Sequence, residues 1–194
     1  FTRRLKPGTR IVDPAEDALV SPCDGYVSEH GVLVGEQLLQ AKGTRYSLAT
    51  LLADDPACAA LRGGYFFTLY LSPRDYHRVH APLGGRLLRM VQIPGRLFSV
   101  APHAVRHIPG LFARNERIAS IFETPVGPVA VIMVGAIMVS SITTVWAGEM
   151  TPPRLQQCRR FDYADVLIEL GKGAEMGHFN MGSTVIVVVP PGTV

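Results

Sequence analysis

The sequence predicts a mostly β domain of the α+β class, built as an antiparallel β-sandwich with a few short helices. Most apolar residues fall in short runs that Gly and Pro residues bound, and these runs are rich in β-branched and aromatic side chains. The chain contains no internal repeat and no Gly-rich nucleotide-binding loop. We expect its 194 residues to form a single domain with one substantial core.

The expected strands follow one another along most of the chain. They cover residues 26–30, 31–39, 65–71, 86–93, 117–124, 129–134 and 138–145, with a last cluster that begins at 166–170. We expect 26–30 and 31–39 to pair as a hairpin. A short helix is expected over 47–52 with Ser47 as its cap, and a second begins at Pro102, where Pro109-Gly110 must interrupt it.

Composition narrows the class of protein. Hydrophobic residues make up 47% and charged residues 18%, which excludes a disordered chain and predicts a large buried or lipid-facing surface. The formal net charge of +3 is too small for a nucleic-acid footprint, but it suits an anionic membrane surface or an acidic substrate. Residues 1–14 form a basic arm, which we expect to be a solvated tail or a lipid contact.

Two further features bear on compartment and membrane. Cys23, Cys58 and Cys158 are far apart and form no Cys-x-x-Cys pair, so we expect a reducing compartment with neither a disulfide framework nor a zinc site. The uncharged stretch 124–148 is long enough to cross a bilayer, but Gly and Pro residues interrupt it at strand-like intervals. We therefore expect buried strands there. Both ends of the chain look cut, so we expect any membrane anchor to lie outside this sequence.

The stretch 177–189 is the candidate site of chemistry. Gly182 precedes Ser183, and a β-branched run over 184–189 follows at once. Glycine can hold a peptide bond in a bent geometry that other residues disfavour, so the Ser183 hydroxyl could attack the Gly182 carbonyl and break the chain by an N→O acyl shift. The alternative is a plain turn between two strands, because Gly-Ser is a common turn pair.

A base and a carboxylate could activate that serine. His77 and His80 lie three residues apart, and Asp24 lies in a turn at 21–25. One imidazole that is paired with Asp24 and aimed at Ser183 would form an Asp/His/Ser relay, in which the carboxylate fixes the imidazole tautomer. A metal site at the two histidines would need further ligands at usable spacing, and none is evident.

Five motifs together resemble the phosphatidylserine decarboxylase family, in the family's order and over the whole chain. They are SPCDG at 21–25, LSPRDYHRVHAP at 71–82, NER at 115–117, VGA at 134–136 and KGAEMGHFNMGST at 172–184. Met181 replaces the usual Leu, a swap that roughly preserves volume and leaves the reacting pair intact. Cys23 replaces a residue that is often small, and we interpret it as packing.

The resemblance implies a proenzyme that cuts itself between Gly182 and Ser183. Residues 1–182 would become the β subunit and residue 183 would begin the α subunit, so the mature protein would be an α/β heterodimer. His80, oriented by Asp24, would remove the Ser183 hydroxyl proton, and Ser183 would end as a pyruvoyl group. This self-derived group would be the cofactor, and no metal would be needed.

The resemblance also implies the reaction and its setting. The amine of phosphatidylserine would form a Schiff base with the pyruvoyl group, and loss of carbon dioxide would give phosphatidylethanolamine. His77 would serve the decarboxylation step. Arg74, Arg78 and Lys172 are candidates for binding the phosphate. We expect a peripheral protein on the cytoplasmic face of the cell membrane, with the basic arm and residues 100–112 facing lipid. A homodimer remains open, and no nucleic-acid partner is expected.

Two other functions stay open at this point. Residues 24–27 and 172–177 are also similar to the hairpins of biotinyl and lipoyl carrier domains, which favours a core like the barrel-sandwich hybrid. A non-catalytic carrier would need a lysine at a hairpin tip, and none lies in the usual apolar frame. A serine hydrolase could use Asp24, His80 and Ser183, but the Gly-x-Ser-x-Gly motif is absent.

Overall fold

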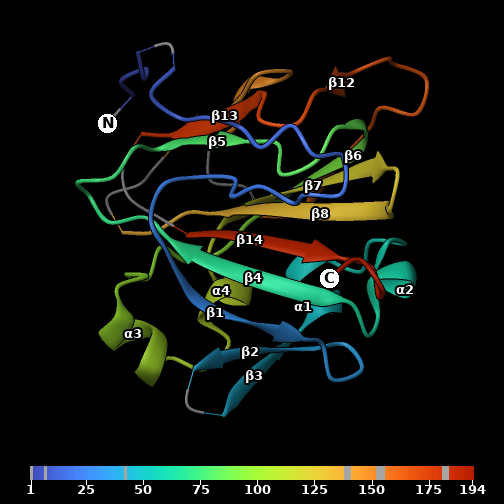
Figure 1. Ribbon diagram of the computed structural model, residues 1–194. Coiled ribbons are helices and arrows are strands. Elements are labelled where there is room, and N and C mark those ends of the chain that lie inside the picture. Colours follow the sequence, from blue (N-terminus) through green and yellow to red (C-terminus); the bar gives the residue numbers. More distant parts are fainter. Residues whose placement is uncertain (1, 7, 42, 138–140, 152–155, 181–183) are drawn as a thin grey trace.

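Antiparallel β-sheets are the main regular structure of the chain in the computed structural model (Figure 1). The structure describes residues 1–194 except 1, 7, 42, 138–140, 152–155 and 181–183. The mostly β, α+β prediction is confirmed. In the described part of the chain, no helix is both long and apolar enough to cross a bilayer.

The largest sheet has eight strands and contains the centre of the core. Its hydrogen-bonded order is β1-β4-β14-β8-β7-β6-β11, and β12 also pairs with β6. The strands are β1 (Tyr26–Val32), β4 (Tyr65–Tyr70), β6 (Gly85–Ile93), β7 (Arg117–Thr124), β8 (Gly127–Val134), β11 (Arg159–Asp162), β12 (Glu169–Leu170) and β14 (Thr184–Val189). All of these strand pairs are antiparallel.

Strand β14 is central in this sheet because its sequence suits full burial. Its six residues read Thr-Val-Ile-Val-Val-Val, and every one is buried. A continuous β-branched run fits a strand that is covered on both faces. β14 bonds to β4 on one side and to β8 on the other, so the sheet fixes the chain from Thr184 onward.

Two smaller sheets flank the large one (Figure 1). The four-stranded sheet has the order β10-β9-β13-β5, with β10 (Gly148–Glu149), β9 (Ile142–Thr144), β13 (Glu175–Phe179) and β5 (Arg78–His80). The hairpin of β2 (Gln37–Ala41) and β3 (Thr44–Ser47) lies beyond β1 on the other side.

Four short helices complete the described chain: α1 (Leu48–Leu52), α2 (Cys58–Leu61), α3 (Pro102–His107) and α4 (Leu111–Arg114). The Ser47 side chain accepts a hydrogen bond from the Thr50 N–H, which confirms Ser47 as the cap of α1. The predicted interruption at Pro109-Gly110 separates α3 from α4. Helix α2 is not among the helices expected from the sequence.

One expected pairing is wrong. Residues 26–30 do not form a hairpin with 31–39, because β1 pairs with β4, and residues 37–41 pair with β3 instead. The aromatic strand β4 offers β1 a longer apolar partner than the Gly-containing stretch 31–39. The expected strand over 138–145 is present only as β9 within the described residues.

Buried polar side chains tie the loops to this core. The Arg117 guanidinium donates to the carbonyls of Thr50 and Leu51 at the end of α1, at 2.7 and 2.8 Å. Asn115 donates to the carbonyls of Phe98 and Gly135, at 2.9 and 2.8 Å. Asn115 of the 115–117 motif therefore binds Gly135 of the 134–136 motif, just beyond the end of β8.

Candidate active site

The segment expected to carry the chemistry connects strands of two different sheets. β13 ends at Phe179, and Thr184 begins β14. The Phe179 N–H donates to the carbonyl of His77 at 3.0 Å, which joins the histidine motif to this segment. Gly182 and Ser183 lie outside the described residues.

Thr184 has an unusual environment for a polar side chain. It lies opposite Tyr70 on β4 and Val134 on β8. Its side chain is 1% exposed, and its hydroxyl has no hydrogen-bond partner within the described part of the chain. A buried hydroxyl usually has a hydrogen-bond partner, so Thr184 is a candidate for contact with a bound group.

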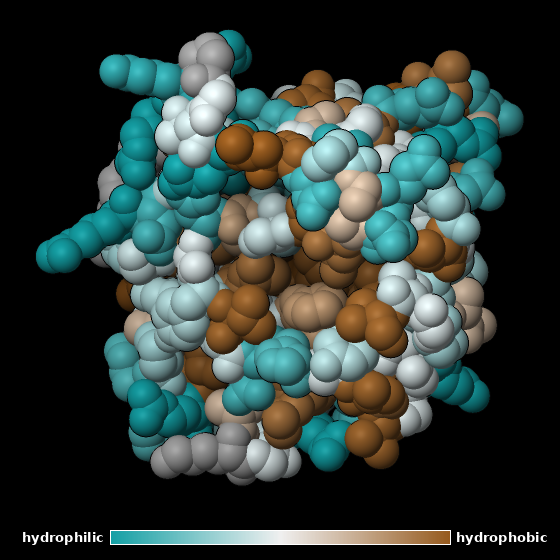
Figure 2. Space-filling model, in the orientation of Figure 1, coloured by the Kyte–Doolittle hydropathy of each residue, from teal (hydrophilic) through white to brown (hydrophobic). Residues whose placement is uncertain are grey.

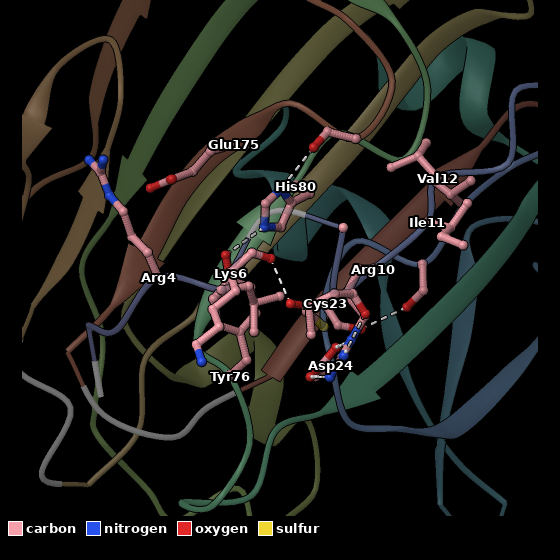
Figure 3. Close-up of a pocket in the computed structure, with 16 residues that line it drawn as sticks. Arg4, Lys6, Arg10, Ile11, Val12, Cys23, Asp24, Tyr76, His80 and Glu175 are labelled. Atoms are coloured by element: carbon pink, nitrogen blue, oxygen red, sulfur yellow. Dashed lines mark hydrogen bonds and ion pairs between the residues drawn. The ribbon is translucent and has the colours of Figure 1, made fainter.

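Both ring nitrogens of His80 have partners (Figure 3). Nδ1 lies 2.8 Å from the Gly173 carbonyl, and Nε2 lies 3.0 Å from the Tyr76 hydroxyl. Because a carbonyl only accepts hydrogen bonds, Nδ1 carries the hydrogen, and in the neutral ring Nε2 accepts from Tyr76. The Tyr76 ring also stacks on His80, with ring centroids 5.7 Å apart. The structure therefore holds His80 with its basic nitrogen toward Tyr76.

Asp24 lines the same cavity as His80, but its hydrogen bonds go elsewhere. The Arg10 guanidinium binds both carboxylate oxygens, with Nε–Oδ1 at 3.0 Å and the second contact at 2.7 Å. In place of the expected Asp24 contact, the described partners of the His80 ring are Gly173 and Tyr76. The two site residues are brought together in one cavity without a direct hydrogen bond between them.

The cavity that contains Asp24 and His80 has a volume of about 570 Å³ (Figure 3). The N-terminal arm forms one of its walls, with side chains that include Arg4, Lys6 and Arg10. The arm is held in place by backbone contacts, because Arg78 donates to the carbonyls of Thr2 and Arg3. The arm, which we expected to be a solvated tail or a lipid contact, thus lines the site.

His77 is fully buried, unlike His80. Burial lowers the pKa of the His77 imidazole, and the neighbouring Asp75 carboxylate only partly opposes this shift. His77 is therefore held neutral near pH 7. It follows Tyr76 in the chain, and its carbonyl bonds to β13, so one short segment carries both histidines toward the strand that precedes position 183.

The three cations expected to bind phosphate have different environments. Arg78 is buried, and its guanidinium forms an ion pair with Glu175. Lys172 donates to the carbonyls of Ala15 and Ala18. Arg74 is exposed. Two of the three therefore have structural partners that hold the N-terminal segment.

Two further sequence interpretations concern cysteine and metal. Cys23 is buried, and burial raises the pKa of its thiol, so it is a neutral packing residue beside Asp24. No cluster of His, Cys, Asp or Glu suited to a metal ion occurs among the described residues.

Sequence reasoning missed three parts of this site: Tyr76, Gly173 and Arg10. Tyr76 was visible within the 71–82 motif, but nothing in the spacing indicated that it faces His80. Gly173 adopts a φ of +78°, which turns the chain so that its carbonyl reaches His80. Arg10 was assigned to a tail, and the contact with Asp24 depends on a fold that brings residues 10 and 24 together.

Comparisons with known proteins agree on one family. The phosphatidylserine decarboxylase family model matches residues 1–194. A phosphatidylserine decarboxylase proenzyme of Acidovorax ebreus (strain TPSY) is 53% identical over 195 residues, covering 100% of this chain and 68% of the relative. The proenzyme of Methylococcus capsulatus is 53% identical over 193 residues, which cover 99% of this chain and 67% of the relative. The proenzyme of Alkalilimnicola ehrlichii is 54% identical over 190 residues, which cover 97% of this chain and 66% of the relative. The chain thus spans about two-thirds of the length of these relatives.

Proposed function

This chain belongs to the phosphatidylserine decarboxylase family, and from that premise we propose that it decarboxylates phosphatidylserine to phosphatidylethanolamine after cutting itself between Gly182 and Ser183. The observation that carries the proposal is the family match over the whole chain. The relatives are named proenzymes, which supports a precursor that is cut to become active.

For the self-cleavage, we assign His80 as the base and Asp24 as its partner. The Ser183 hydroxyl gives its proton to Nε2 of His80 as its oxygen attacks the Gly182 carbonyl carbon; His80 then passes the proton to the departing Ser183 nitrogen, so that the Gly182–Ser183 amide becomes an ester. Loss of the Ser183 Cα proton eliminates the Gly182 carboxylate, which ends the larger fragment and leaves a dehydroalanine at position 183. Water hydrolyses this dehydroalanine to the pyruvoyl group and ammonia. Nε2 must exchange the Tyr76 hydroxyl for that of Ser183 before it can accept the proton. Asp24 shares the cavity with His80, and release of Arg10 would free its carboxylate.

The strand arrangement supports an α/β heterodimer after cleavage. The fragment that starts at residue 183 contains β14, which hydrogen-bonds to β4 and β8 of the larger fragment. All six β14 residues are buried. Their apolar surface, at about 25 cal/mol per Å² removed from water, would hold the two fragments together without a covalent bond.

The residues next to position 183 fit a pyruvoyl group. A keto group there would be bonded to Thr184, whose buried hydroxyl has no partner among the described residues. When formed, this group supplies a carbonyl that takes up the electron pair released as carbon dioxide leaves. No metal ion is required for that role.

His77 is our candidate for moving the proton during decarboxylation. Burial lowers its imidazole pKa, so His77 is neutral near pH 7 and would first accept a proton as a base and then return it to the substrate carbon. Apolar walls around the substrate would also favour loss of a charged carboxylate over its retention.

We further propose a peripheral position on the cytoplasmic face of the membrane. Four apolar side chains at or near β1 are exposed, namely Tyr26, Val27, Val32 and Val34. Figure 2 shows hydrophobic residues gathered on this face of the molecule. Helix α3 adds exposed basic residues nearby, including Arg106, and this combination suits an anionic lipid surface.

The proposal is tested by measuring carbon dioxide release from phosphatidylserine in neutral detergent micelles. The wild-type chain should release carbon dioxide and lose that activity after borohydride reduction, whereas Ser183→Ala should be inactive. Ser99→Ala, which changes the same residue type elsewhere, is the matched control. Carbon dioxide release by Ser183→Ala would refute the proposal. A lysine adduct would favour the carrier function, and an intact chain labelled at Ser183 by a serine-directed probe would favour the hydrolase.

A further inference from the structure

A second cavity, with a volume of about 250 Å³, lies at the end of the large sheet where β14 begins. Helix α3 contributes Pro102, Val105 and Arg106 to its wall, and Phe112 of α4 adds an aromatic ring. Gln40 fixes the helices here, because its amide donates to the Val105 carbonyl at 2.7 Å and accepts from Leu111 N–H at 2.9 Å. Hydrogen bonds therefore fix the helices around the cavity, whose wall is mainly apolar.

The strand register brings this cavity to Thr184, the residue that follows position 183 in the chain. Tyr26 pairs with Tyr70, and Tyr70 pairs with Thr184, so three adjacent strands present these residues in one row. All three line the cavity. Thr184 is bonded to residue 183 and has the buried hydroxyl without a partner in the described structure. A ligand in the cavity would thus meet the hydroxyl of the residue that is bonded to position 183.

The charges in the cavity match a zwitterionic phosphate ester. Arg106 is exposed, and its described hydrogen bond uses Nε, which donates to the Pro102 carbonyl at 3.1 Å. The two terminal nitrogens of the Arg106 guanidinium have no hydrogen bond or ion pair within the described residues. A guanidinium with both terminal nitrogens available can bind two oxygens of a phosphate. Glu29 supplies a carboxylate to the same cavity from β1. A phosphate and an ammonium group on one ligand could each find an opposite charge.

The two cavities can then serve different steps. The cavity around Asp24 and His80 is lined by the arm and by β5 and β13 neighbours, and no described residue of β14 lines it. Resting on the proposed function, we infer that the cavity beneath α3 receives the phosphoglycerol part of the serine phospholipid, with Arg106 bound to the phosphate and Thr184 beside the reacting end. The apolar wall of Val105 and Phe112 then contacts the start of the acyl chains.

Binding can be measured without any reaction by using the uncut Ser183→Ala chain. The probe is glycerophosphoserine, which carries the headgroup and phosphate but no acyl chain, and the measurement is titration calorimetry. Adding Arg106→Gln should weaken its binding about tenfold, the factor expected for losing one charge-assisted hydrogen bond at a partly exposed site. Arg159→Gln is the matched control, because Arg159 is also exposed but lies on β11 at the opposite edge of the sheet. Equal dissociation constants for the Arg106 and Arg159 variants would overturn the inference.

A second variant blocks the cavity while leaving the cleavage site intact. Ala41 lines the cavity from β2, so Ala41→Phe should fill it. The chain should still be cut, which also shows that it folds, but its KM for phosphatidylserine in neutral micelles should rise at least about tenfold. An unchanged KM in a cut Ala41→Phe protein would place the substrate elsewhere. If Arg106→Gln weakens only adsorption to anionic vesicles, and not glycerophosphoserine binding, then Arg106 serves solely as a membrane contact and the inference fails. Loss of wild-type cleavage would instead refute the proposed function.

Discussion

Replacing Tyr76 with Phe should accelerate self-cleavage. The Tyr76 hydroxyl lies 3.0 Å from Nε2 of His80, the nitrogen that must accept the Ser183 proton. A neutral hydrogen bond contributes a net free energy of about 1 kcal/mol, and 1.36 kcal/mol corresponds to a tenfold change in rate, so removing this competitor should raise the cleavage rate about fivefold. Phenylalanine keeps the ring that stacks on His80.

The assay follows the appearance of the two fragments over time on a denaturing gel, starting from freshly synthesised precursor. Tyr65→Phe is the matched control, because the Tyr65 hydroxyl also contacts a histidine, with 3.3 Å to Nδ1 of His30, at an exposed position. It should leave the rate unchanged. Slower cleavage by Tyr76→Phe would show that the hydroxyl assists His80, and the assignment of Tyr76 as a competitor would then be wrong.

The remaining predictions concern stability and the position of the cleavage segment. Burial alone would raise the pKa of Asp55, but hydrogen bonds from Arg89 and a backbone N–H lower it below the ordinary value. Asp55 in the unfolded chain therefore takes up its proton at a higher pH than in the folded chain, so the free energy of unfolding should fall below about pH 4. Asp55→Asn should lower the free energy of unfolding by about 2–3 kcal/mol and flatten its pH dependence, as measured by urea unfolding. In Gly177→Ala, the new Cβ would lie 2.1 Å from the Thr143 carbonyl oxygen, so cleavage should fall severely on a gel. Gly171→Ala, where a Cβ meets nothing within 4 Å, should be cut normally, and equal cleavage of both variants would contradict the role given to β13.

Much of the fold follows from local pattern, and the rest depends on contacts between distant segments. The β-branched run of β14 and the cap at Ser47 are local signals, and both elements form where the sequence places them. The hairpin expected for residues 26–39 fails because the choice of partner depends on β4, which lies more than thirty residues away in the chain. No periodicity within 26–39 carries that information.

The site divides in the same way. Motif resemblance brings Asp24, His77 and His80 forward as candidates, and the structure places Asp24 and His80 in one cavity. The motifs do not reveal that Arg10 binds the Asp24 carboxylate or that the Gly173 carbonyl fixes the His80 tautomer. Those contacts arise from backbone groups and from an arm without periodicity, so residue type alone could not predict them.

The most direct measurement is the intact mass of the purified protein, compared between the wild-type chain and Ser183→Ala. The wild-type sample should contain two chains that separate under denaturing conditions, the smaller one beginning at position 183 with a keto group in place of its amine. Ser183→Ala should give one uncut chain. A single uncut wild-type chain that still converts phosphatidylserine, or cutting at another peptide bond, would contradict the account.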